Sequence, residues 1–202
     1  MPSFKLTNEI AVISLKEHIQ EKVKELAKGA QNAVVIGGGV LGLEAAWELR
    51  KAKLNVTVLE GAPVLMAGKV DPETVRILTD VAKQKGIEIK VGVKIDEISG
   101  AEHVDGVVAD GEKIAADLVL VSTGVRANIG IAKDAGLATD RAVIVDKNMA
   151  SSVAGIYAAG DCAQFDGANI TIWPVASEMG RIAGANAAGE ALVYEPDVNG
   201  MS

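Results

Sequence analysis

Three glycines and one acidic residue in the first third of the chain have the types and spacing of a dinucleotide-binding site. Gly37, Gly39 and Gly42 form a G-x-G-x-x-G pattern directly after an apolar run. In such a loop the first glycine permits a sharp turn, the second removes a side chain where a pyrophosphate approaches, and the third lets helix and strand pack closely. N–H groups at the start of the following helix favour the phosphates. The residues predicted to contact the cofactor are Gly37, Gly38, Gly39, Val40, Leu41 and Gly42.

Glu60 predicts which nucleotide the loop holds. It lies 18 residues after Gly42, at the end of the next apolar run, and an acid about 20 residues on is expected to bind the adenosine ribose. Its carboxylate can accept from both ribose hydroxyls and repels a 2′-phosphate, so NAD(H) is favoured over NADP(H). No arginine follows in 61–63, and Lys69 is the nearest cation. The alternatives are a glycine loop used only for packing and a solvated acid at a strand end.

Four other residues with polar or reactive side chains have simple explanations. Glu44 suits the start of a helix electrostatically, which explains it at least as well as a cofactor role. His103 lies beside acidic residues and is expected on the surface. Cys162 is expected to be a small buried residue, because the chain has no second cysteine to pair with it. Trp173 is expected either to stack near a ligand or to pack in the core.

Strands and helices alternate along the part of the chain that must position the glycine loop. Strands are predicted at 34–36, 56–59 and 87–91, with a helix at 40–51 between the first two. Asp71 and Pro72 predict the start of a second helix, which Gly86 ends. Parallel strands need such crossovers, so the pattern indicates half of a doubly wound, Rossmann-like α/β sheet. The buried face of the second helix is expected to comprise Val75, Leu78, Val81 and Ala82.

The pattern changes after the third strand. Short strands are predicted at 94–99, 103–109 and 113–114, with Asp110-Gly111 as a hairpin turn. A buried strand is predicted within 116–124, so an antiparallel meander interrupts the parallel sheet. A second region follows Gly124, with apolar stretches at 142–146 and 155–161 and a helix expected near 176–188. At the other end of the chain, Ser14 and Glu17 fit the capping box of an amphipathic helix that ends at Gly29.

Composition excludes several classes of protein. The 202 residues carry a net charge of −7 without a basic cluster, which argues against a nucleic-acid partner. A single cysteine excludes an intrachain disulfide and a redox pair. The first ten residues lack the apolar segment of a signal peptide, and no apolar run is long enough to cross a membrane. We therefore expect a cytoplasmic protein without a membrane partner, and no metal-ligand cluster is recognised.

Three motifs together resemble a known family. "VVIGGGVLGLE", "STGVRAN" and "GIYAAGDCA", in this order and spacing, are similar to those of the flavoprotein reductases that bind two dinucleotides, the pyridine nucleotide–disulfide oxidoreductase superfamily. Within it, the rubredoxin, ferredoxin and nitrite reductases resemble the chain most. The resemblance covers nearly everything after Asn32.

The resemblance implies two cofactors, NAD(H) and FAD, and a role for further residues. It implies that Glu44 lies close to the nicotinamide and flavin. Gly124 matches a glycine where the chain returns to the flavin domain. The pair Gly160 and Asp161 matches the site where an aspartate binds the ribityl chain of FAD. Backbone N–H groups of the helix after Trp173-Pro174 match those that face the flavin, and the candidates are Val175 and Ala176.

The resemblance also predicts the domain organisation. The expected parts are a lead-in at 1–31, an NAD-binding domain at 32–123, the closing part of an FAD-binding domain at 124–194, and a linker or tail at 195–202. Ala127 replaces a proline common in relatives, which changes little. No second glycine loop for FAD is present, and Asp161 lies 124 residues after Gly37, too near for that loop to be the FAD loop. We therefore expect an excerpt that binds NADH modestly and FAD poorly.

Two functions remain open from the sequence. The first is part of an NADH-dependent flavoprotein oxidoreductase, in which a hydride passes from NADH to FAD. Electrons then leave to an external acceptor, an electron-transfer protein such as rubredoxin or a small oxidant, because no cysteine pair is available. No residue of the chain is assigned as catalytic, and the chain alone is expected to be inactive. The second is a non-catalytic NAD-binding regulatory module. A homo-oligomer is compatible with either.

Overall fold

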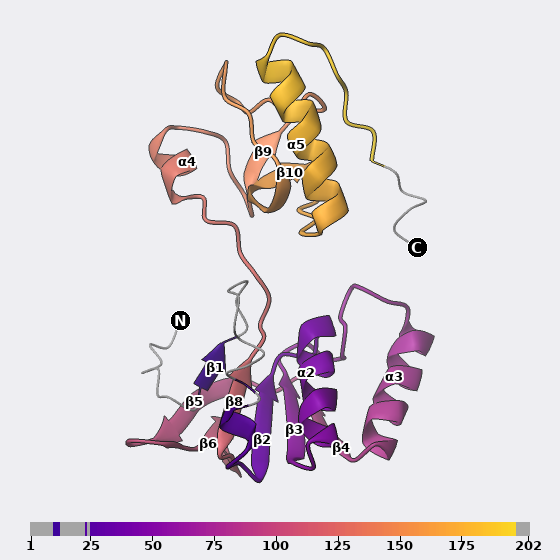
Figure 1. Ribbon diagram of the computed structural model, residues 1–202, viewed down its shortest axis with the longest axis vertical. Helices are drawn as coiled ribbons and strands as arrows, with labels where there is room; N and C mark the ends of the chain where they lie inside the picture. The colour runs from indigo at the N-terminus through magenta and orange to yellow at the C-terminus, as the bar shows by residue number, and fades with distance from the viewer. Residues whose placement is uncertain (1–9, 13–22, 24, 197–202) are drawn as a thin grey trace. The chain divides into compact units, whose positions relative to one another are not determined.

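The computed structural model describes residues 10–12, 23 and 25–196, and the chain divides after Gly124 into two compact units (Figure 1). Each unit has its own core. The capping box of Ser14 and Glu17 lies outside the described residues, whereas Val23 and residues 25–27 are helical. The first unit holds the glycine loop.

Five parallel strands form the central sheet of the first unit, in the order β1-β8-β2-β3-β4. The strands predicted at 34–36, 56–59 and 87–91 are present and adjacent, since each follows the previous one through a crossover. The prediction of a parallel, Rossmann-like α/β sheet is confirmed. The strand bounds are β1 Ile10–Val12, β2 Asn32–Ile36, β3 Asn55–Glu60, β4 Ile87–Val91 and β8 Leu118–Val121.

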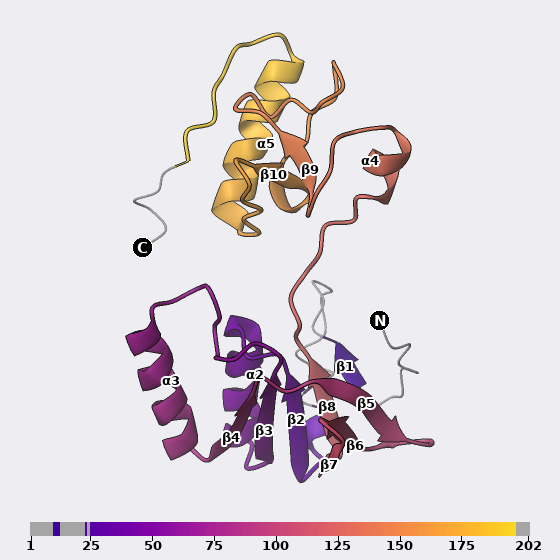
Figure 2. The same ribbon diagram turned by 180° about the vertical axis from the view of Figure 1, so that it is seen from behind.

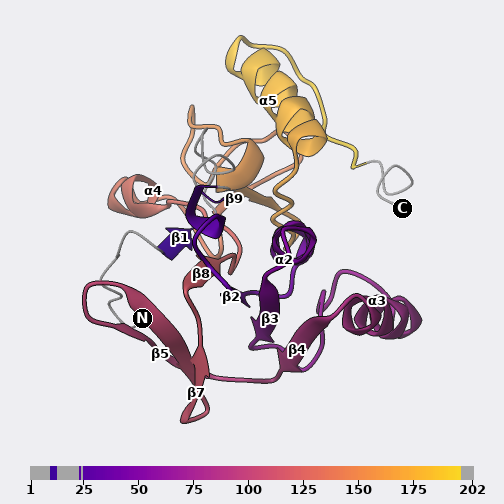
Figure 3. The ribbon, with the colours of Figure 1, turned by 60° about the horizontal axis from the view of Figure 1, so that its bottom comes forward.

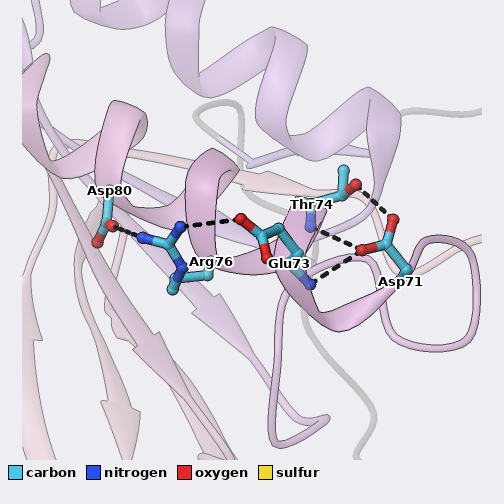
Figure 4. Close-up of polar contacts among 5 residues, drawn as sticks. All are labelled: Asp71, Glu73, Thr74, Arg76 and Asp80. Atoms are coloured by element: carbon cyan, nitrogen blue, oxygen red, sulfur yellow. Dashed lines mark hydrogen bonds and ion pairs between the residues drawn. The ribbon is translucent and has the colours of Figure 1, made fainter.

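Helix α2 (Val40–Lys51) and helix α3 (Pro72–Gln84) are the crossovers. Asp71 caps α3 as predicted, because its Oδ1 accepts the N–H groups of Glu73 at 2.9 Å and Thr74 at 3.0 Å (Figure 4). Hydrogen bonds from Thr74, first from its hydroxyl, lower the pKa of Asp71. Helix α3 thus starts on a local sequence signal.

The two faces of the sheet are covered by different layers, as Figure 3 shows. Val35 and its neighbours pack against Ala46 and Leu49 of α2 and Ala82 of α3. Residues one position along the strands, such as Val34, pack against the meander instead. This alternation follows from the two-residue period of a strand. The apolar runs of β2 and β8 are therefore buried on both faces, as parallel strands require.

The meander consists of β5 (Ile95–Gly100), β6 (Val104–Ala109) and β7 (Glu112–Ala115) (Figure 2). Its strands are antiparallel neighbours in this order. The predicted hairpin turn is present, with Asp110 at φ +49° and Gly111 at φ +78°. Two positive φ angles suit a two-residue turn that matches the strand twist.

One predicted buried face is wrong in part. On α3, Ala82 is buried and Val75 and Leu78 are half-buried, but Val81 is 46% exposed. Consecutive helical residues point about 100° apart, so a helix that centres Ala82 on the sheet turns Val81 aside. Ile77, one turn earlier, is exposed as well.

The second unit packs a long helix over two short parallel strands. Its elements are α4 (Gly130–Asp134), β9 (Val143–Val145), η1 (Gly160–Cys162), β10 (Ala163–Phe165) and α5 (Trp173–Ala187). The helix predicted near 176–188 is present and begins three residues earlier. Residues 155–161 form a loop that ends in η1, because Gly155 and Gly160, with φ of +79° and +73°, bend the chain.

Buried Asn186 ties the end of the second unit to its core. Its Nδ2 donates to the carbonyls of Asn148 and Leu192, and its Oδ1 accepts the Leu192 N–H at 2.7 Å. Tyr194 is thereby buried and packs edge-on against Phe165, with ring centroids 5.4 Å apart. All hydrogen-bonding groups of this amide are satisfied, as burial demands.

Among the residues with described positions, no helix is both long and apolar enough to cross a membrane. The same residues contain no cluster of three or more His, Cys, Asp and Glu side chains that could hold a metal ion.

Candidate dinucleotide-binding site

The glycine loop and Glu60 lie together at the carboxyl end of the parallel sheet. Gly37 follows β2 directly, Glu60 is the last residue of β3, and these strands are neighbours. The Gly37 N–H donates to the Leu59 carbonyl at 2.8 Å. In open α/β sheets ligands bind at this edge, outside the strand ends.

Two of the three motif glycines are required by the fold itself. Gly37 has φ +115°, and a Cβ there would lie 2.1 Å from the Ser122 carbonyl oxygen. A Cβ on Gly42 would lie 2.0 Å from the Gly37 carbonyl oxygen. Both distances are shorter than any real carbon–oxygen contact. These glycines let β2, β8 and the first turn of α2 approach one another.

Gly39 is different, because nothing in the described chain explains it. Its φ of −83° and ψ of −177° suit any residue, and a Cβ there would meet no atom within 4 Å. Gly39 is also the N-cap of α2 and supplies no side chain to its N–H groups. The N–H groups of the first turn have no acceptor within the helix. An open space therefore lies against a helix start that favours an anion.

Glu60 is held by its own loop with its carboxylate at the glycine turn. Oε2 accepts the Gly38 N–H at 2.6 Å, and Oε1 accepts the Ala62 N–H at 2.7 Å. Each carboxylate oxygen has a second lone pair, so both can still accept a hydroxyl proton. No Lys or Arg forms an ion pair with Glu60 within the described residues. Lys69 is exposed beyond it. The half-buried carboxylate is therefore available to hydroxyl donors of a ligand.

The remaining loop residues lie at the start of α2. Val40 and Leu41 are 49% and 53% exposed, and Glu44 is exposed one turn further on. Two apolar side chains open to solvent at a helix start provide surface for a flat, partly apolar ligand.

The second predicted group comes together within the second unit. Gly160 lies in η1 against the first turn of α5, because a Cβ on it would lie 3.2 Å from the Ala176 Cβ. Exposed Asp161 follows it. The Ala176 N–H donates to the Ile172 carbonyl at 3.0 Å, whereas the Val175 N–H precedes the first intrahelical bond. Val175 is thus the freer of the two backbone donors. Gly124, at φ +85°, is the last residue of the first unit.

Solvent exposure tests three expectations from the sequence. Cys162 was expected to be buried, and this is wrong: the turn η1 places it at the surface, where its thiol donates to the Ala159 carbonyl. Trp173 is 84% exposed, so it does not pack in a core of the described residues. His103 is exposed as expected.

Sequence reasoning missed the residues that orient Glu60. The Ala62 N–H and the buried side chain of Leu65 lie around the acid. No sequence signal marks them, because one alanine and one leucine in a loop fit many arrangements.

Comparisons with known proteins identify the family of the chain. A family model described as pyridine nucleotide-disulphide oxidoreductase matches residues 5–180. An NADH oxidase of Methanocaldococcus jannaschii is 34% identical over 85% of this chain and 40% of its own length. A rubredoxin-NAD(+) reductase of Ectopseudomonas oleovorans is 37% identical over 73% of this chain and 38% of its own. A solved ferredoxin reductase of Rhodopseudomonas palustris superimposes with a TM-score of 0.79 at 35% identity, over 88% of this chain and 46% of that one. The chain thus spans less than half the length of each.

Proposed function

This chain belongs to the pyridine nucleotide-disulphide oxidoreductase family, and from that premise we propose that its first unit binds NADH for a flavoprotein reductase. The observation that carries the proposal is Gly39. Its backbone angles and surroundings would accept a larger residue, so its lack of a side chain is explained by a ligand. A pyrophosphate fits the open space beside the α2 N-terminus by charge and by hydrogen-bonding capacity.

The preference for NADH over NADPH rests on Glu60. Its two oxygens, already oriented by Gly38 and Ala62, are proposed to accept the two hydroxyls of the adenosine ribose. A 2′-phosphate would instead meet a carboxylate without a paired cation. Val40 and Leu41 are proposed to flank the pyrophosphate, and Glu44 to lie toward the nicotinamide.

The second unit is proposed to contribute to an FAD site. Asp161 and the first turn of α5 are adjacent through Gly160, which combines a hydroxyl acceptor with the Val175 N–H as a donor. Asp161 would accept from the ribityl chain, the Val175 and Ala176 backbone would face the flavin ring, and Gly124 would lie where the chain passes between the units. When bound, FAD supplies the chemistry that converts a two-electron hydride into single electrons.

The proposed electron acceptor is an external carrier protein such as rubredoxin, or a small oxidant. The sequence holds one cysteine, so no cysteine pair of this chain can receive the electrons. The cytoplasm is the proposed location. The proposed division is 1–31, 32–123, 124–194 and 195–202, and the unit boundary after Gly124 supports its main division.

The test is Gly39→Ala in the full chain, titrated with NADH calorimetrically. A Cβ at this position meets no protein atom, so the unfolding midpoint should stay nearly constant, with a cost below about 1 kcal/mol. A methyl group in the pyrophosphate space should raise the Kd for NADH at least about ten-fold.

The matched control is Gly180→Ala, within α5, where a Cβ also meets nothing. It should leave NADH binding unchanged and raise stability by roughly 0.5–1 kcal/mol through helix propensity. Unchanged NADH affinity in Gly39→Ala would remove the basis of the proposal.

A further inference from the structure

The loop after β3 folds back over the glycine turn. We call residues Gly61–Met66 the β3 clasp. The Met66 N–H donates to the Gly38 carbonyl at 3.0 Å, and the Ala62 carbonyl accepts the Gly92 N–H at 2.8 Å from the loop after β4. With the Ala62 N–H on Glu60, the clasp connects the acid, the glycine turn and the neighbouring loop.

Leu65 anchors this clasp. It is 1% exposed, whereas Val64 beside it is 41% exposed. Its Cδ2 lies 2.6 Å from the position of a Cβ built on Gly38, and the Glu60 Cβ lies 3.1 Å from the same position. Leu65, Gly38 and Glu60 therefore pack around a single point. A side chain at Gly38, which is not one of the three motif glycines, would therefore displace the end of the Leu65 side chain.

The backbone next to the anchor is strained. Met66 has φ +54°, a left-handed conformation that is unfavourable for a residue with a Cβ. Such a conformation persists only where the surroundings fix it. Here the buried Leu65 side chain on one side and the hydrogen bond from Met66 to Gly38 on the other supply that restraint.

We propose that Leu65 is a positioning residue for the adenosine ribose: by anchoring the β3 clasp, it fixes the direction of the Glu60 carboxylate. The inference rests on the proposed NADH site. Glu60 has several rotatable bonds, and hydrogen bonds to two ribose hydroxyls need one orientation of its carboxylate. Without the anchor, the clasp and its Ala62 donor shift away, and the acid becomes mobile.

The effect should differ between the two nicotinamide cofactors. NADH gains from an oriented carboxylate, so its affinity should fall when the anchor is removed. NADPH is repelled by the same oriented charge and should lose less. The ratio of the two dissociation constants therefore reports on the orientation of Glu60, independently of general stability.

The experiment compares Leu65→Ala with Leu118→Ala in the full chain, by titration with NADH and with NADPH. Leu118 is fully buried in the same core cluster and pairs with Ala33, at the opposite end of β2 from the glycine turn. Leu65→Ala should raise the Kd for NADH roughly ten-fold, the value of about one charged hydrogen bond. The preference for NADH should shrink accordingly. Leu118→Ala should lower the unfolding midpoint and keep the preference.

A conservative substitution at the same position tests whether the preference for NADH can be restored. Leu65→Met keeps the volume of the anchor and should restore the preference for NADH. If Leu65→Ala does not fold, Leu65→Val gives the same comparison with a smaller expected change. An equal preference in the Leu65 and Leu118 variants would overturn the inference alone. A wild-type chain that binds neither cofactor would overturn the proposed function, and the inference with it.

Discussion

The carboxylate of Glu60 takes part both in the fold and in the proposed recognition of the cofactor. It accepts N–H groups from either side, from Gly38 in the glycine turn and from Ala62 in the following loop. A ribose would meet an acid already oriented, and such preorganisation lowers the entropic cost of binding. The same oxygens that are proposed to accept a 2′-hydroxyl proton would oppose a 2′-phosphate.

Replacing Glu60 by Gln should change cofactor preference and should also remove one of the two loop hydrogen bonds, because an amide NH2 cannot accept an N–H. Gln keeps the shape but loses the charge, and it offers one oxygen in place of two. We expect the Kd for NADH to rise roughly ten-fold, with little change or a gain in NADPH affinity. Titration of both cofactors measures the ratio. Glu88→Gln, which alters an exposed acid on β4 that accepts from Thr57, should leave the ratio unchanged. A preserved NADH preference in Glu60→Gln would contradict the role given to the charge.

The roles of individual glycines were predictable from sequence to different degrees. Strand, turn and helix signals around Gly37 and Gly42 fixed the local geometry, and the structure shows the close contacts that require both. Leu65 could not be predicted, because its partner Gly38 becomes its neighbour only when the β3 clasp folds back. A long-range contact of this kind leaves no periodic signal in the chain.

Among the elements, Asp117 joins the starts of two central strands. It precedes β8, and its Oδ2 accepts the N–H groups of Asn32 at 2.8 Å and Gln31 at 3.0 Å at the start of β2. These hydrogen bonds, first that from Asn32, lower the pKa of Asp117 in the folded protein. The ionised form therefore stabilises the fold.

The lowered pKa of Asp117 determines how its contribution to the free energy of unfolding changes with pH. Because the folded pKa lies below the unfolded value, this contribution is complete above about pH 4 and is lost as the pH falls through the folded pKa. Asp117→Asn should lower the free energy of unfolding at pH 7 by about 1 kcal/mol or less, since the group is exposed. The difference from wild type should vanish in acid. Urea unfolding across pH measures it, with Glu97→Gln on β5 as the control. A difference that persists at low pH would contradict this origin.

The start of α3 was predictable because its signal is local. Asp71 and Pro72 carry the cap and the first helical residue, and Figure 4 shows the resulting hydrogen bonds. Helix α4 and strand β10 were not predicted. Helix α4 has five residues and no side-chain cap, and β10 has three residues whose partner β9 lies earlier in the chain. Short elements of this kind depend on tertiary pairing rather than on propensity.

At the scale of the whole molecule, each core draws its residues from one unit. Leu118 belongs to a cluster formed within the first unit, and fully buried Met149 to a cluster within the second. Separate cores indicate separate cooperative units of unfolding.

Two calorimetric transitions are therefore expected. Leu118→Ala should destabilise only one of them, and Met149→Ala only the other, each by about 2–5 kcal/mol as for large-to-small changes in a core. A single transition shifted by both variants would show instead that the units unfold as one.

The strand order has a consequence for folding of the chain during its synthesis on the ribosome. Strand β8 lies between β1 and β2, and Val119 pairs with Ile10 on one side and Val34 on the other. The central position in the sheet is thus filled by a segment synthesised long after both of its neighbours. Until Val121 has been synthesised, the edges of β1 and β2 that pair with β8 have no partner. Loop closure over such a separation is slow, so assembly of the first unit is completed by its last strand.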